Sequence, residues 1–170
     1  MTTTAFQGTT VTLSGDVPAA GAAAPDFTLV KTDLSPLSKA DLAGKRVVLN
    51  IFPSVDTGVC AASVRRFNEL AAATGDDVVV LNVSRDLPFA LDRFCGAEGI
   101  ENAEAASDFR HGFGDAFGAV QADGPLAGLL ARAVVILDAE GTVTYVQVVD
   151  EITTEPDYDA AMSALAGVGA

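Results

Sequence analysis

Hydrophobic residues follow two different spacings along the chain, and the change between them predicts a βαβ unit near the middle. Two runs, 47–52 and 77–83, are mostly apolar without alternation, which is typical of strands that are covered on both faces. Between them, apolar residues recur on one face of a helix, at Cys60, Val64, Phe67 and Ala71. Gly75 is expected to end this helix. Strand, helix and strand in this order predict two parallel strands joined by a right-handed crossover.

Further short elements flank this unit on both sides. Period-2 alternation over residues 5–17 predicts an N-terminal hairpin. Pro88 is expected to open a helix that Cys95 ends, just before Gly96. The other predicted elements are strand 27–30, a helical turn at 38–42, a short strand at 103–107, a helix over 111–120, a loop at 121–130, antiparallel strands 132–137 and 142–149, and a helix over 156–165. Together they predict one α/β domain over residues 1–170, with a mixed sheet and helices on both faces.

The turn between the first strand of the unit and its helix, PSVDTGVC at residues 53–60, carries the candidate chemistry. Cys60 falls in the first helical turn, where unpaired N–H groups and the helix dipole stabilise a thiolate, the nucleophilic form of cysteine. Pro53 cannot extend the strand, and its ring can shield the sulfur from water. Thr57 lies three residues before Cys60, close enough for its hydroxyl to reach the sulfur. Cys60 alone leaves open an ordinary strand–turn–helix with a buried structural cysteine.

The motif Pro53-x-x-x-Thr57-x-x-Cys60 resembles the active site of the peroxiredoxins. The wider sequences NIFPSVDTGVCAASVRRFNEL, GPLAGLLARAVVILD and VVDEITTEPDY resemble the thiol peroxidase subfamily, so that the resemblance covers nearly the whole chain. It implies a thioredoxin-like fold, a mixed β-sheet flanked by helices, with an N-terminal hairpin extension within residues 1–17. It also implies an antioxidant enzyme: a thioredoxin-dependent peroxidase that reduces hydroperoxides, prefers organic ones to hydrogen peroxide, and forms a homodimer.

Arg132 is the candidate cation of the expected site. It begins a core strand after a loop, and a guanidinium there would stabilise both a thiolate and the charge of the transition state. The residues alone leave open an ion pair with a nearby carboxylate, Asp138 or Asp123. The resemblance at LLARAVVILD favours the active-site role. Arg65 and Arg66 lie one turn or more into the helix and are expected on the surface.

Cys95 is the candidate resolving thiol, an assignment that comes mainly from the resemblance. Its attack on a Cys60 sulfenic acid would form an intramolecular disulfide. The residues alone leave open a buried helix position stacked on Leu91. Because the two cysteines lie on separate helices, we expect one or both helix ends to unwind during turnover.

Composition narrows the remaining possibilities. The net charge of −13 disfavours nucleic acid and acidic membrane surfaces as partners. No apolar run is long enough for a membrane span, and the N-terminus does not look like a signal peptide, so a cytoplasmic location is expected. A cysteine pair in that reducing compartment fits a redox cycle better than a permanent crosslink. With one histidine, His111, and no metal-ligand spacing or phosphate-binding glycine loop, no metal and no cofactor are expected.

Two other functions compete with the peroxidase. A thioredoxin-like disulfide reductase or isomerase is disfavoured because the chain has no C-x-x-C sequence. A redox-sensing protein that signals through a Cys60–Cys95 switch would use the same chemistry, and only turnover would separate it from an enzyme.

Overall fold

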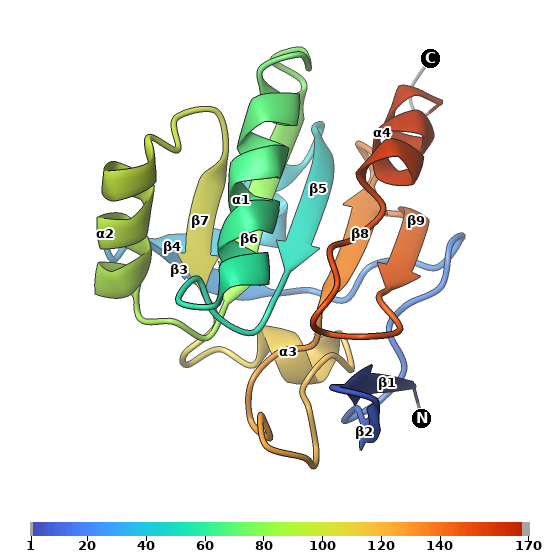
Figure 1. Ribbon diagram of the computed structural model, residues 1–170. Helices are drawn as coiled ribbons and strands as arrows, with labels where there is room; N and C mark the ends of the chain where they lie inside the picture. Colours follow the sequence, from blue (N-terminus) through green and yellow to red (C-terminus); the bar gives the residue numbers. More distant parts are fainter. Residues whose placement is uncertain (1, 168–170) are drawn as a thin grey trace.

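The fold is a mixed sheet of seven strands with a separate two-stranded hairpin at the N-terminus. We describe it from a computed structural model that covers residues 2–167 (Figure 1). The strand order in the sheet is β4-β3-β7-β6-β5-β8-β9. The strands are β1 (Thr3–Phe6), β2 (Thr9–Thr12), β3 (Thr28–Lys31), β4 (Pro36–Ser38), β5 (Arg46–Ile51), β6 (Val78–Ser84), β7 (Glu104–Ser107), β8 (Ala133–Leu137) and β9 (Val143–Val148). This arrangement confirms the predicted α/β class with a mixed sheet and an N-terminal hairpin.

The predicted βαβ unit forms the centre of the sheet. Strands β5 and β6 pair in parallel, and α1 (Gly58–Ala71) connects them. Strand β8 pairs with the other edge of β5 in the antiparallel sense, so that Ala133 lies opposite Ile51. The start of β8 therefore meets the end of β5, where the chain leaves the sheet for the candidate turn.

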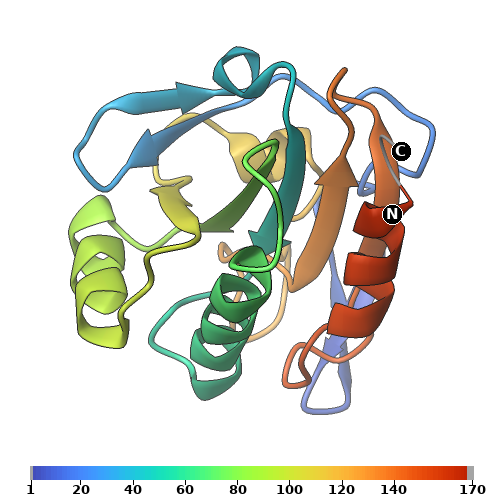
Figure 2. The ribbon, with the colours of Figure 1, turned by 90° about the horizontal axis from the view of Figure 1, so that it is seen from above.

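Helices cover both faces of the sheet. Figure 2 shows α1, α2 (Pro88–Glu98) and α4 (Tyr158–Ala166) on one side, with α3 (Phe113–Ala116) and the 3-10 turn η1 (Lys39–Leu42) on the other. Successive residues of β5 serve the two faces in turn, because side chains alternate along a strand. Leu49 belongs to the apolar cluster beneath α3, whereas Val48 packs with the residues of α1 and α4. A third cluster, which contains Cys60, lies between α1 and α2.

The N-terminal hairpin docks beside the end of β9. Its turn uses Gln7 and Gly8, both with positive φ, as a two-residue hairpin turn requires. The amide of Ala5 donates to the carbonyl of Asp150 at 2.9 Å, and the amide of Ile152 donates back to Ala5 at 2.8 Å. The hairpin is thus hydrogen-bonded to a segment that follows the last strand, and Figure 1 shows it below the sheet.

Helix ends were predicted less well than the helices themselves. Helix α2 continues past Cys95 to Glu98, so the expected end before Gly96 is wrong. The stop is Gly99, whose φ of 66° gives the left-handed cap. Gly96 inside the helix costs about 1 kcal/mol relative to alanine, too little to end it. Helix α1 ends at Ala71 rather than near Gly75.

Two further predictions need correction around the short elements. The helix expected over 111–120 is a single turn, Phe113–Ala116, because Gly112 and Gly118 on either side adopt positive φ. The helical turn expected over 38–42 is Lys39–Leu42, and Pro36–Ser38 before it forms a short edge strand, β4, paired with β3. Proline is tolerated there because an edge strand leaves one row of N–H groups unpaired.

Candidate active site

Cys60 is the third residue of α1, in the first helical turn as predicted. Thr57 is the N-cap residue, with extended backbone angles, and the helix begins at Gly58. The Cys60 side chain is fully buried in the cluster between α1 and α2. Its carbonyl accepts a hydrogen bond of 2.8 Å from the hydroxyl of Ser63, one turn further along the helix. The sulfur is therefore held at a helix start and excluded from bulk water.

Arg132 immediately precedes β8, the strand paired with β5, and its side chain reaches the Cys60 sulfur. Its Nη2 lies 3.2 Å from Cys60 Sγ, and its Nε donates to the carbonyl of Ile152 at 2.8 Å. The arginine is only 2% exposed. Its Nη1 is buried and has no hydrogen-bond partner among the described residues. One guanidinium thus holds the sulfur, is fixed by a carbonyl, and keeps one donor unused.

The carboxylates proposed as alternative partners of Arg132 are engaged elsewhere. Asp138 accepts from the amides of its own turn, and Asp123 accepts from the amide of Thr12 at 2.8 Å. The other arginines near the helix have surface partners, as expected: Arg65 pairs with Glu98, and Arg66 with Glu69. Of the arginines considered, Arg132 alone has a hydrogen bond to the cysteine among the described contacts.

A small cavity of about 120 Å³ opens beside this pair. Three of the predicted site residues line it, Pro53, Thr57 and Arg132. The rest of its wall is mostly apolar and comes from four separate segments, through Phe6, Gly58, Val59, Leu126, Ile152 and Thr153. Phe6 belongs to the N-terminal hairpin, so the docking of the hairpin completes the cavity. The structure therefore gathers Pro53, Thr57 and Arg132 around one small, largely apolar space, and Cys60 is joined to it through its contact with Arg132.

Thr57 lies at this cavity but does not bond to the sulfur as the sequence suggested. Its hydroxyl donates to the carbonyl of Ser54 at 3.1 Å, within the turn itself. A hydroxyl has a single proton to donate, so the Cys60 sulfur does not receive it in this conformation. The side chain is exposed and faces the cavity rather than the buried sulfur.

Cys95 lies apart from these four residues. It is half-buried on α2, at the edge of the apolar cluster that contains Cys60, and both cysteines are free thiols. It lines a different cavity, of about 520 Å³, together with residues of α2, β7 and the β3–β4 turn. Burial raises the pKa of the Cys95 thiol, and the neighbouring Asp92 carboxylate raises it further. In this conformation Cys95 is therefore a protonated thiol at neutral pH.

Sequence reasoning overlooked two polar groups that support the site. The Asp86 carboxylate accepts from the hydroxyl of Ser54 at 2.7 Å and from the amide of Val55 at 2.9 Å, both in the candidate turn. Asn50 and Asn82, opposite each other on β5 and β6, are buried and joined at 2.9 Å. The Asn50–Asn82 pair could have been found in the sequence, because an asparagine occurs in each of two apolar strands. The contacts of Asp86 with the turn depend on the tertiary fold and leave no pattern in the sequence.

Within residues 2–167, no helix is long and apolar enough to cross a membrane. The same residues contain no cluster of three or more histidine, cysteine or carboxylate side chains that could hold a metal ion.

Comparisons with known proteins agree on one family. The Redoxin family profile matches residues 19–162. A thiol peroxidase of Corynebacterium glutamicum is 56% identical over 97% of this chain and 99% of its own length. One of Mycobacterium tuberculosis is 55% identical over 94% of this chain and 96% of its own. Among solved structures, a peroxiredoxin-like protein from Aquifex aeolicus matches with a TM-score of 0.93 and 41% identity, over 97% of this chain and 96% of its own.

Proposed function

The chain belongs to the Redoxin family and is a thiol peroxidase of the peroxiredoxin type, and from this we propose that it reduces hydroperoxides with Cys60 as the attacking thiolate, Arg132 as the stabilising cation and Cys95 as the resolving thiol. One observation supports the site assignment most directly. The guanidinium of Arg132 lies 3.2 Å from the sulfur and keeps a buried, unused donor. A buried polar donor without a partner is costly, which fits a group whose partner arrives with the substrate.

In the first step the Cys60 thiolate attacks one oxygen of the hydroperoxide. The S–O bond forms as the O–O bond breaks, and the departing alkoxide takes up a proton to become an alcohol. Arg132 stabilises the thiolate, and its free Nη1 donates to a peroxide oxygen as negative charge develops there. Pro53 keeps water from the sulfur, and Thr57 at the cavity wall orients the peroxide. The product on the enzyme is a Cys60 sulfenic acid.

In the second step the Cys95 thiol attacks this sulfenic acid, and a disulfide and one water molecule form. In the structure Cys60 is fully buried against Arg132, whereas Cys95 lines a separate cavity beside α2. A disulfide requires Cα atoms within about 7 Å and correctly directed Cβ atoms. Because Cys60 is fully buried at the start of α1, we infer that the first turn of α1 unwinds, the end of α2 rearranges, or both.

The substrate and the reductant follow from the cavity and from the family. The cavity beside Arg132 is lined largely by apolar side chains, including Phe6, Leu126 and Ile152, and this supports organic hydroperoxides as preferred substrates over hydrogen peroxide. The disulfide needs an external dithiol to return it to two thiols, and we propose thioredoxin for that role. We also propose a homodimer in the cytoplasm, with residues 1–170 as one domain.

Turnover with cumene hydroperoxide and a thioredoxin system tests this assignment. Cys60→Ser should abolish peroxide consumption. Cys95→Ser should reduce about one equivalent and then stop, because the sulfenic acid forms but is not resolved. Full turnover by Cys60→Ser would refute the assignment of Cys60 as the nucleophile. Disulfide formation without sustained turnover would favour the redox sensor over the enzyme.

A further inference from the structure

We propose that Asp86 is a positioning residue that holds the turn before Cys60 in its peroxide-reducing conformation, and that release of its hydrogen bonds is the step that allows the Cys60–Cys95 disulfide to form. This inference rests on the proposed function and adds a residue that none of the catalytic roles above includes. Asp86 touches neither sulfur in the described contacts. It acts through the turn at residues 53–57.

The side chain of Asp86 binds this turn at two places. Its Oδ1 accepts from the hydroxyl of Ser54 at 2.7 Å, and its Oδ2 accepts from the amide of Val55 at 2.9 Å. Oδ2 also accepts from the hydroxyl of Ser84, at the end of β6, at 2.6 Å. Hydrogen bonds to a carboxylate are roughly twice as strong as those between neutral groups. The carboxylate therefore links the end of a central strand to the start of the catalytic segment.

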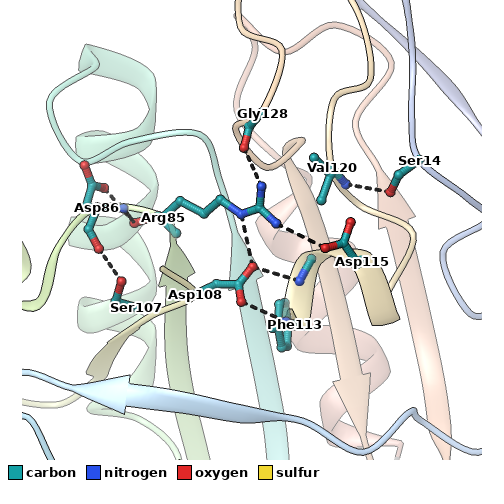
Figure 3. A network of polar contacts seen from close by, with 11 residues as sticks. Ser14, Arg85, Asp86, Ser107, Asp108, Phe113, Asp115, Val120 and Gly128 are labelled. Atoms are coloured by element: carbon teal, nitrogen blue, oxygen red, sulfur yellow. Dashed lines mark hydrogen bonds and ion pairs between the residues drawn. The ribbon is translucent and has the colours of Figure 1, made fainter. Parts of the chain in front are cut away.

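The backbone around Asp86 is fixed to the rest of the protein, as Figure 3 shows. Its carbonyl accepts from the hydroxyl of Ser107 on β7. The preceding residue, Arg85, bonds to the buried carboxylate of Asp108 at 3.2 Å and to the carbonyl of Gly128 at 2.7 Å. Asp86 is thus an anchored group, and the turn before α1 is the part that can leave it.

Asp86 also stands next to the second cysteine's helix. Helix α2 begins at Pro88, two residues further along the chain, and carries Cys95. Helix α1 begins at Gly58, shortly after the turn that Asp86 binds. Asp86 therefore binds the turn that leads into α1 and lies two residues before the start of α2. A movement that carries the turn away from Asp86 breaks these hydrogen bonds.

These bonds belong to one of the two conformations that the reaction needs. In the folded conformation Cys60 lies against Arg132, which suits attack on the peroxide. For the disulfide the sulfur must leave Arg132, and the turn leaves Asp86 with it. Weaker bonds at Asp86 consequently shift the population toward the open conformation. Weaker bonds at Asp86 should therefore accelerate disulfide formation without accelerating sulfenic acid formation.

The substitution Asp86→Asn tests this separation, because it keeps the shape and removes the charge. An amide offers one oxygen in place of two, so it cannot accept from all three donors. After a rapid mix of the reduced chain with cumene hydroperoxide, thiol blocking and intact mass spectrometry report sulfenic acid, disulfide and sulfinic acid over time. We expect disulfide formation to be about tenfold faster, as the loss of roughly 1.4 kcal/mol from the folded conformation predicts. The sulfinic fraction should fall by about the same factor, and sulfenic acid formation should be unchanged or slower.

Two further variants complete the test. Ser54→Ala removes the hydrogen bond from the Ser54 hydroxyl to Asp86 and should accelerate disulfide formation by a smaller factor. This variant replaces Asp86→Asn in the test if Asp86→Asn does not fold. Asp115→Asn is the matched control, since this exposed carboxylate pairs with Arg85 at 3.7 Å and does not touch the turn. It should behave as the wild type does.

The proposal is overturned if disulfide formation is unchanged or slower in Asp86→Asn, as a general loosening of the site would make both steps slower. Equal acceleration in Asp115→Asn would overturn it as well. A wild-type chain that forms no sulfenic acid would instead contradict the proposed function itself.

Discussion

Replacement of Arg132 by methionine separates a catalytic role of the guanidinium from a structural one. At 3.2 Å between Nη2 and Sγ, two unit charges attract by about 5 kcal/mol with an effective dielectric constant near 20. Part of this attraction stabilises the resting thiolate, and part stabilises the transition state. We therefore expect the second-order rate of Cys60 with a hydroperoxide to fall by about 10²–10³ in Arg132→Met.

Stability should respond differently. Arg132 is buried, has an unpaired Nη1, and is bonded to a carbonyl and a sulfur rather than to a carboxylate in the described contacts. In Arg132→Met the Cys60 sulfur can remain a neutral thiol, so that an apolar side chain and a thiol replace the buried charge pair, and replacing a whole buried pair by apolar groups of similar volume is often neutral or stabilising. The thermal midpoint of reduced Arg132→Met should then stay level or rise while its rate falls.

The assay is a single-turnover mixing experiment with peroxide in excess, alongside thermal unfolding of the same samples. Arg65→Met is the matched control, because Arg65 lies on α1 but pairs on the surface with Glu98 at 3.4 Å. It should leave the rate unchanged. A rate loss in Arg132→Met below about threefold would refute the electrostatic reasoning, and a parallel fall in the thermal midpoint would assign Arg132 a structural role instead.

Cys95, Ser63 and Glu151 provide three further tests. In a Cys60→Ser background, the pH midpoint for iodoacetamide alkylation of Cys95 should lie above that of a free thiol, and Asp92→Asn should lower it; a midpoint at or below the free value would contradict the raised pKa. Ser63→Ala removes the 2.8 Å hydrogen bond to the Cys60 carbonyl, and urea unfolding should show a loss of about 1–3 kcal/mol; an unchanged denaturation midpoint would argue against it. Hydrogen bonds from the amides of Thr153 and Gly8 lower the pKa of Glu151 from 4.5 to about 2. Its contribution to stability is therefore full above pH 4.5 and is lost as the pH falls toward 2, so that the thermal midpoints of the wild type and Glu151→Gln should differ above this range and converge within it.

The sequence predicted the fold where the hydrophobic pattern was strong. The two central strands, the helix between them and the position of Cys60 in its first turn follow from local spacing alone. Helix ends were harder, because a glycine ends a helix through its backbone angle and not through its identity. Gly96 is helical, whereas Gly99 has a φ of 66°, and composition does not distinguish them.

In the site, too, the sequence predicted the residues but not the contacts that depend on the tertiary fold. Arg132 could be nominated from its place at the start of a core strand, but its contact with Cys60 depends on the antiparallel pairing of β8 with β5. The expected bond from Thr57 to the sulfur failed because the carbonyl of Ser54, nearer in the turn, takes its proton. Asp86 could not be found at all, since its partners meet it only after the sheet has assembled.

The sulfur and the guanidinium that meet in the finished protein are 72 residues apart along the chain. During synthesis Cys60 leaves the ribosome well before Arg132, and the strand that delivers the arginine joins the sheet only after it has been translated. A nascent or truncated chain thus carries the cysteine without its cation. On the proposed assignment of Arg132, the Cys60 thiol becomes sensitive to oxidants only after residue 132 has been translated and β8 has joined the sheet.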